Sequence, residues 1–253
     1  MHLGPLKSQL VDSGVKTATP RNVLTVVAFN VHHGEYRSTV ARLIQLHPKI
    51  LVLPECCKPA THGNGDVVWF GENPRKGVAV VARDGWRVEK APEDRRVPNS
   101  VYPVTVRGPE TFNLLAVWAM KRPTYMKAVL EGVKTYSAFL KSAPSIIVGD
   151  FNSHKRWDAN DRKASHSVLE KYLREEFGLV SAFHQAAIRD GRTMETPTYY
   201  HYWRRTNPFH IDYCFFPESW VNRLGKVLIS DFSSFANESD HRPLAVEFGP
   251  RLI

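Results

Sequence analysis

The sequence predicts an α/β or layered α+β domain, on three observations. From Val23 onward, short runs rich in β-branched and aromatic residues, bounded by turn residues, alternate with a few stretches of helical periodicity. The 253 residues and the apolar fraction of 43% are enough to fill a sizeable core. No internal repeat, low-complexity tract or long linker divides the chain. We therefore expect a flexible N-terminal arm over residues 1–22 and a single domain over residues 23–253.

The predicted elements begin with strand, helix, strand and continue as a meander. Strands are predicted from short apolar runs at Val23–Phe29, Ile50–Leu53, Gly77–Val81, Val101–Val106, Phe112–Trp118, Ser145–Val148, His210–Phe216, Lys226–Ser230 and Pro243–Phe248. Helices are predicted where apolar residues recur every three to four positions, from Val40 until Pro48, over Tyr125–Lys141 and over Ser167–Phe177. The run of strands in the middle of the chain indicates mixed pairing, not a doubly wound parallel sheet.

Charge and cysteine content narrow the class of protein. The 34 Lys and Arg against 25 Asp and Glu give a net charge of +9, which favours anionic partners, although a solvated basic surface explains it equally well. Cys56, Cys57 and Cys214 are too few and too irregularly spaced for a disulfide framework or a paired zinc motif, so we expect a cytoplasmic protein. The longest apolar run, Leu114–Met120, is far shorter than the roughly 20 residues that cross a bilayer, which predicts no membrane partner.

Five polar clusters stand at the ends of predicted strands. They are Phe29-Asn30-Val31-His32, Leu53-Pro54-Glu55, Gly149-Asp150-Phe151-Asn152, His210-Ile211-Asp212-Tyr213 and Ser239-Asp240-His241-Arg242-Pro243. Each alone is weak evidence, because Asn and Asp also cap turns and helices. Strand ends are where a sheet offers side chains to a common cleft, so the five together predict a site.

The residue types in these clusters suit the cleavage of a phosphate ester. That reaction needs neutralised charge on the phosphoryl oxygens and a deprotonated water, and a divalent cation supplies much of both. Mg²⁺ prefers oxygen ligands, which the carboxylates of the clusters offer. The amides of Asn30 and Asn152 can orient a carboxylate, a water or a phosphoryl oxygen without adding charge. His241 adds a group that titrates near neutrality.

In this order, the five clusters resemble the endonuclease/exonuclease/phosphatase superfamily. That superfamily includes exonuclease III-like abasic-site endonucleases, pancreatic-type deoxyribonucleases and inositol-polyphosphate phosphatases. The resemblance spans Val23 to Phe248 and includes the internal strand Gly77-Val78-Ala79-Val80-Val81. It implies a four-layered sandwich of two mixed central β-sheets flanked by helices, with a metal cleft at one edge.

The resemblance also implies a metal site. Glu55 would be the principal ligand of Mg²⁺, for which Mn²⁺ is a possible substitute. Asn30 would lie beside Glu55, and Asp240 would be a further carboxylate of the metal site.

The resemblance implies roles in the reaction for four other residues. Asp150 would orient and activate the attacking water, and Asn152 would hold that water or the scissile phosphate. His241 would bind and polarise the phosphate or act as the base. Asp212 would be the partner of His241 or belong to a second metal position, so Asp212 and Asp240 could exchange roles.

The segment Thr198–Arg205 is the richest candidate for substrate binding. Its arginines can clamp phosphates and its aromatic rings can stack on a base, which the resemblance tilts toward DNA; the alternative is a β-hairpin with a half-buried aromatic face. We expect the substrate-binding residues to be His32, Lys155, Arg156, Tyr200, Trp203, Arg204 and Arg205. A solvated loop is an equal alternative for Lys155 and Arg156, and a turn is one for His32.

The sequence therefore predicts a divalent-metal-dependent phosphodiester hydrolase acting on DNA, an endonuclease of the nonspecific or abasic-site type. One alternative is a phosphatase or phosphodiesterase of inositol phosphates or phospholipid headgroups. Another is an inactive nucleic-acid-binding module, because Trp118 aligns with a Tyr or His that many members of the superfamily carry. The sequence leaves the oligomeric state open.

Overall fold

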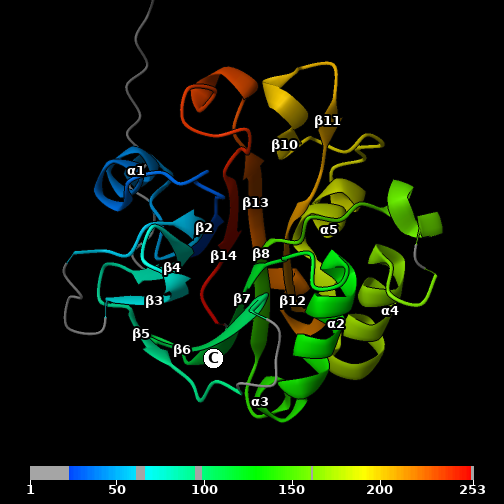
Figure 1. The fold of residues 1–253 in the computed structure, drawn as a ribbon. Coiled ribbons are helices and arrows are strands. Elements are labelled where there is room, and N and C mark those ends of the chain that lie inside the picture. The colour runs from blue at the N-terminus through cyan, green and yellow to red at the C-terminus, as the bar shows by residue number, and fades with distance from the viewer. Residues whose placement is uncertain (1–22, 61–65, 95–98, 161, 252–253) are drawn as a thin grey trace, which may run out of the picture.

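Two six-stranded β-sheets packed face to face form the centre of the structure, a computed structural model that describes residues 23–60, 66–94, 99–160 and 162–251 (Figure 1). The first sheet has the order β13 (Leu224–Ile229), β14 (Leu244–Phe248), β1 (Leu24–Ala28), β2 (Ile50–Cys56), β4 (Lys76–Ala82) and β3 (Val67–Asn73). The second has the order β5 (Arg87–Lys90), β6 (Val101–Arg107), β7 (Phe112–Trp118), β8 (Ser145–Asp150), β12 (Asp212–Pro217) and β9 (Leu179–Ser181). Each sheet contains one parallel pair, β1 with β2 and β7 with β8.

Helices cover the outer faces of both sheets. Helix α1 (Tyr36–Leu43) lies on the first sheet, and α2 (Tyr125–Thr135), α3 (Ser137–Lys141) and α4 (His166–Phe177) lie on the second (Figure 1). One apolar core fills the space between the sheets. A second lies between the first sheet and α1, and a third lies between the second sheet and α2, α3 and α4. Helix α5 (Ala182–Arg189) contributes Ala182 and Ala186 to the core between the sheets. The predicted four-layered sandwich of two mixed sheets is confirmed.

Several elements differ from the prediction for local reasons. Strand β3, the short strands β5 and β9, and helix α5 are not among the predicted elements; β5 has four residues and β9 three, too few for alternation to be visible. The helix predicted over Tyr125–Lys141 is interrupted at Tyr136, where ψ is 18°. The Tyr136 hydroxyl accepts a hydrogen bond from the backbone N of Asp94 at 2.9 Å. The predicted N-terminal arm, residues 1–22, lies outside the described residues.

None of the helices in the described part of the chain combines the length and the apolar character that a bilayer crossing requires. Besides the α-helices, these ranges contain short 3₁₀ helices, of which Ile44–Leu46 directly follows α1. A two-stranded hairpin, β10 (Tyr199–Tyr200) with β11 (Pro208–Phe209), projects at the upper end of the sandwich in Figure 1.

The order and direction of the strands bring the polar clusters to one edge. Asn30 follows β1 and Glu55 lies near the end of its parallel neighbour β2. Asp150 ends β8, and Asp212 begins the antiparallel β12 directly opposite it in register. His241 precedes β14, which runs antiparallel to β1. Five segments far apart in sequence therefore meet at the same end of the two sheets.

Candidate active site

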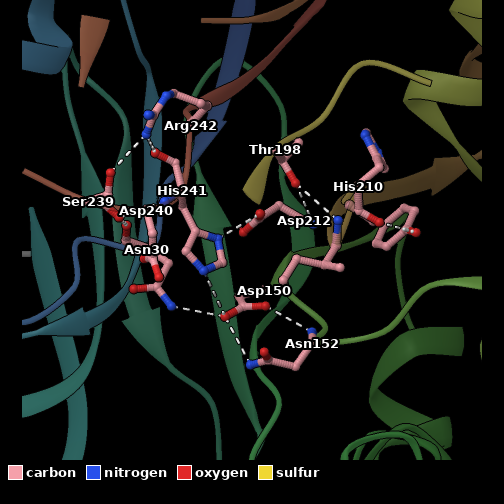
Figure 2. A network of polar contacts seen from close by, with 12 residues as sticks. Asn30, Asp150, Asn152, Thr198, His210, Asp212, Ser239, Asp240, His241 and Arg242 are labelled. Carbon is pink, nitrogen blue, oxygen red and sulfur yellow. Dashed lines mark hydrogen bonds and ion pairs between the residues drawn. The ribbon is translucent and has the colours of Figure 1, made fainter. Parts of the chain in front are cut away.

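A fully buried carboxylate, Asp150, is the centre of the polar network (Figure 2). Its Oδ2 accepts hydrogen bonds from the side-chain amides of Asn30 at 2.9 Å and Asn152 at 3.1 Å. Its Oδ1 accepts from the backbone N of Asn152 at 2.8 Å. Asn152 has φ of 47°, a left-handed conformation that Asn tolerates, and this turn folds its amide back toward Asp150. Local backbone geometry therefore helps to fix the Asn152 amide on this carboxylate.

His241 lies between two buried carboxylates. Its Nδ1 is 2.9 Å from Oδ2 of Asp212, and its Nε2 is 3.9 Å from Oδ2 of Asp150. Burial by itself lowers the pKa of His241, but the charges of Asp212 and Asp150 outweigh it and raise the pKa to about 9. Burial raises the pKa of the Asp150 carboxyl, with His241 opposing and Asp212 adding to the rise. The imidazole is thus held as a cation beside Asp150.

The turn that carries His241 is held by two residues around it. The Ser239 hydroxyl donates to the backbone O of Asn30 at 2.7 Å and accepts from the backbone N of His241 at 2.9 Å. The buried Arg242 guanidinium donates to the backbone O of Ser239 at 2.8 Å and to that of His241 (Figure 2). These contacts tie the turn to the strand end that carries Asn30.

Two residues that the sequence analysis did not select support the Asp212–His241 pair. The Thr198 hydroxyl accepts hydrogen bonds from the backbone N of Ile211 and of Asp212, both at 3.0 Å. The ring of Tyr199 packs on the imidazole of His241, with centroids 4.7 Å apart. Both belong to the segment Thr198–Arg205, which was predicted to bind substrate. Only the position of this segment close upstream of Asp212 indicated that it could also support the Asp212–His241 pair.

The described residues contain a group of side chains that fits a divalent cation. The carboxylates of Asp150 and Asp212 can supply its oxygen ligands, and His241, with a ring nitrogen within 4.8 Å of both, is their protonated partner and not a ligand. Oδ1 of Asp212 is buried and has no hydrogen-bond partner among the described residues, so this carboxylate oxygen is left for another ligand. Asn30 links this group to Glu55, because its amide is also 3.2 Å from Oε1 of Glu55. The donor set of carboxylates and amides suits Mg²⁺ or Mn²⁺.

The predicted metal ligands Glu55 and Asp240 lie at the more open side of this group and face cationic or polar partners. Glu55 Oε2 is 3.4 Å from Nε2 of His33 and 3.5 Å from Nζ of Lys76. Oδ1 of Asp240 is 3.6 Å from Nδ1 of His32. The sequence leaves His33, like His32, undecided between a local phosphate contact and a turn histidine, and nothing in the spacing of Lys76 relates it to Glu55. The roles of Glu55, Asp240 and Asn30 as metal ligands stay predictions.

Trp118 belongs to the core between the sheets. Its side chain is buried, and the ammonium of Lys76 lies over its ring at 4.8 Å from the centroid. An indole there supplies no proton to a leaving group. Lys76 therefore contacts both Glu55 and Trp118.

The aromatic hairpin predicted to bind substrate lies beside the site. Tyr202 is 70% exposed and Trp203 is 40% exposed, and both have left-handed backbone conformations. The Trp203 ring contacts His32 edge to face, with centroids 4.8 Å apart. The Arg204 guanidinium lies over the ring of Tyr202. The hairpin alternative is correct for the backbone, and the exposed rings remain available to a ligand.

Of the other predicted substrate-binding residues, Lys155, Tyr200 and Arg205 contact side chains on other elements. The Lys155 ammonium is 2.7 Å from Oε2 of Glu170 on α4, and its role in substrate binding stays a prediction. Arg156, next to it, is exposed. The half-buried Tyr200 packs against Phe232, and the Arg205 guanidinium lies over the same Phe232 ring. The sequence could not show these partners, since they lie on other elements.

The buried acidic and histidine cluster lies at one edge of a two-sheet α/β sandwich. The chain belongs to the Endonuclease/Exonuclease/phosphatase family, whose sequence profile matches residues 27–241. Members of this family are nucleases and phosphatases that depend on divalent metal. No curated protein matches the sequence.

Solved structures with the same fold include two nucleic-acid enzymes and a further family member. The endonuclease domain of TRAS1, a telomere-specific non-LTR retrotransposon, has a TM-score of 0.63 and 16% identity, covering 90% of this chain and 98% of that one. A variant of the 3′ phosphatase NExo from Neisseria, bound to product DNA hairpin, has a TM-score of 0.66 and 18% identity, covering 89% and 99%. An endonuclease/exonuclease/phosphatase from Beutenbergia cavernae DSM 12333 has a TM-score of 0.60 and 14% identity, covering 90% and 72%. At identities this low, the structural likeness shows a shared fold alone.

Proposed function

We propose that the chain is a divalent-metal-dependent phosphodiester hydrolase that acts on DNA, as an endonuclease of the nonspecific or abasic-site type. Mg²⁺ is the proposed metal, and Mn²⁺ can substitute for it. The observation that carries the proposal is the buried Asp150–His241–Asp212 arrangement, which lies beside an exposed hairpin of aromatic and basic residues. The net charge of +9 suits a polyanionic substrate.

The side chains divide the chemistry between them. A divalent cation held by this carboxylate group would neutralise charge on the phosphoryl oxygens and favour ionisation of a water. Asp150, with its raised pKa and its orientation fixed by two amides, is suited to accept a proton from the attacking water. His241, kept protonated by Asp212, presents Nε2–H toward the same place and can stabilise a phosphoryl oxygen.

The hairpin supports DNA as the substrate class. Trp203 connects it to the site through His32, whose imidazole is in turn 3.6 Å from Asp240. The exposed rings of Tyr202 and Trp203 can stack on bases, and Arg204 can pair with a phosphate of the backbone. DNA as the substrate class agrees with the names of two structural neighbours, an endonuclease domain of a retrotransposon and a 3′ phosphatase bound to a DNA hairpin.

The test is the cleavage of defined DNA substrates. Nicking of supercoiled plasmid and of an abasic duplex is measured with Mg²⁺, with Mn²⁺ and with EDTA, and we expect cleavage that EDTA abolishes. The Asp150→Asn variant should lose at least roughly 100-fold in kcat while it still binds the DNA. Asp190→Asn, which changes an exposed carboxylate at the end of α5, is the matched control and should retain full activity.

Other outcomes separate the remaining candidates. Release of phosphate from a 3′-phosphorylated oligonucleotide without nicking would assign the site to phosphatase chemistry on DNA. Release of phosphate from inositol phosphates, with no effect on DNA, would favour the small-substrate phosphatase. Salt-sensitive DNA binding without turnover of any phosphoester would mark an inactive binding module and contradict the proposal.

A further inference from the structure

A cavity opens directly beside Asn152, and neither the carboxylate cluster nor the hairpin uses it. Its volume is about 280 Å³. Its walls are the start of α2, the segment that follows β8 and the start of α4, lined by Thr124, Tyr125, Met126, Asn152, Ser153, His154, Trp157, Asp158, Ala164, Ser165 and His166. Since the amide of Asn152 is hydrogen-bonded to Asp150, the cavity begins one residue away from the buried carboxylate.

The surface of this cavity is mainly apolar and aromatic. Tyr125, which is 38% exposed, stands at the rim, and Met126 is buried beneath it. The half-buried indole of Trp157 is held between two neighbours, with its ring centroid 4.8 Å from that of Phe209 and 5.9 Å from that of His154. Trp157 therefore contributes an aromatic ring, fixed by these two neighbours, to the lining of the cavity.

Several polar side chains around the cavity are already engaged with the protein. Both carboxylate oxygens of Asp158 accept from backbone N groups at the start of α4, at 3.0 Å from His166 and 3.4 Å from Ser167. The Ser153 hydroxyl is 2.8 Å from Nδ1 of His166. Among the described lining residues there is no Lys or Arg, and Asp158 is an acid, so a phosphate group would be disfavoured there.

These features select the kind of ligand. A cavity of about 280 Å³ is just below the range of about 300–1,000 Å³ for typical small-molecule pockets, so it accepts one ring system and not a longer segment of chain. A polyhydroxylated ring such as inositol would leave its hydroxyls without partners against apolar walls. A nucleobase has two flat faces that stack on an aromatic side chain, and its sugar can reach the neighbouring phosphate.

We propose that this cavity receives one unpaired nucleobase next to the scissile phosphate, with Trp157 as its stacking surface. The inference rests on the proposed function, because it assumes that a nucleotide phosphate lies at the carboxylate cluster. A base in the cavity has left the stack of the double helix, which costs least at frayed ends, in single strands and beside lesions. The substrate class is therefore DNA with an unstacked nucleotide at the cleavage position.

Two ligands that share a phosphate test the cavity without turnover. Deoxyadenosine monophosphate carries a base and deoxyribose 5-phosphate does not, and the dissociation constants of both are measured with Mg²⁺ present. For the wild-type protein we expect the nucleotide to bind on the order of 5- to 100-fold more tightly, as base–aromatic stacking predicts. Trp157→Ala should reduce this ratio to near one by weakening only the nucleotide, and Trp157→Phe should retain most of it.

Three further variants make the result specific. Tyr125→Ala, at the exposed rim, should lower the ratio in part and serves if Trp157→Ala fails to fold in a thermal unfolding measurement. Tyr172→Ala, on α4 and outside the cavity lining, is the control and should leave the ratio unchanged. Loss of the ratio in Trp203→Ala alone would locate the base on the hairpin and overturn the inference.

The inference and the proposed function fail in different ways. Equal binding of the two ligands by the wild-type protein, or an unchanged ratio in Trp157→Ala, would refute the base pocket even if DNA is cleaved. A ratio that depends on Trp157, together with no cleavage of any DNA, would support the pocket and refute the hydrolase. If both hold, single-stranded and frayed DNA should be cleaved faster than fully paired duplex.

Discussion

Replacement of Gly149 by alanine tests how the sheet positions the buried carboxylate. Gly149 precedes Asp150 in β8 and has φ of 141°, a backbone conformation that residues with a Cβ rarely adopt. A Cβ built at this position would lie 2.1 Å from the backbone O of Val117 on the parallel strand β7. Because β8 also pairs with β12 on its other side, the strand cannot move away from β7 without disturbing that second ladder.

The magnitude follows from comparison with a glycine that has room. Gly178 ends α4 with φ of 60°, and no atom lies within 4 Å of a Cβ added there. In Gly178→Ala only the left-handed backbone conformation is unfavourable, so the free energy of unfolding should fall by about 1–2 kcal/mol. Gly149→Ala adds the steric overlap, and we expect a loss of at least about 3 kcal/mol, a large share of the roughly 5–15 kcal/mol of a typical domain.

Urea unfolding and DNA cleavage measure the two consequences. The unfolding free energy should fall more for Gly149→Ala than for Gly178→Ala, and kcat should fall roughly 100-fold for Gly149→Ala only, because a shift of about 1 Å misplaces Asp150. Equal unfolding free energies for the two variants, or full activity in Gly149→Ala, would refute the argument that the glycine is required for close approach of β7 and β8.

Three other predictions concern the site and its surroundings. Asp212→Asn removes the carboxylate 2.9 Å from Nδ1 of His241, so steady-state kinetics should show a loss of roughly 100-fold or more in kcat with an unchanged circular dichroism spectrum. Burial lowers the pKa of His210 to about 4, so His210 stays neutral in the folded protein while the unfolded chain protonates near pH 6.5. Urea unfolding should therefore show stability lost as pH falls from 6.5 to 4, by at most about 3 kcal/mol from this residue, and His210→Gln should lack that component. Mg²⁺ should raise the thermal unfolding midpoint and EDTA should reverse the rise, since a cation bound to the folded carboxylate cluster favours the folded state; no rise at millimolar Mg²⁺ would contradict a metal site.

The strands and the positions of the polar clusters were predictable because their signals are local. Val23–Phe29 and Phe112–Trp118 are continuous apolar runs bounded by turn residues, and the structure has strands at Leu24–Ala28 and Phe112–Trp118. A polar residue directly after such a run lies at a strand end whatever the rest of the fold does. Alternation and turn chemistry act over a few residues, so one sequence is enough to reveal them.

Contacts between distant segments were not predictable in the same way. Lys76 lies by Glu55 and Lys155 pairs with Glu170, and neither contact could be read from the predicted strands or motifs next to these lysines. Nothing in the spacing of Thr198 indicated that its hydroxyl would accept from the backbone of Asp212. The sequence aligned Trp118 with a Tyr or His of other superfamily members, and the packing of the two sheets on each other makes it a core residue.

By itself, the sequence determined most of the longer strands, which polar groups end them and which family they resemble. The tertiary structure alone decided the strand order and register that bring Ser239 to Asn30 across 209 residues, and the packing of α2 and α4 that leaves a cavity beside Asn152. The physical reason is that hydrophobic periodicity reports only whether a side chain is buried. Which buried or edge residues become neighbours depends on the pairing of whole strands and on side-chain volumes contributed by the entire core.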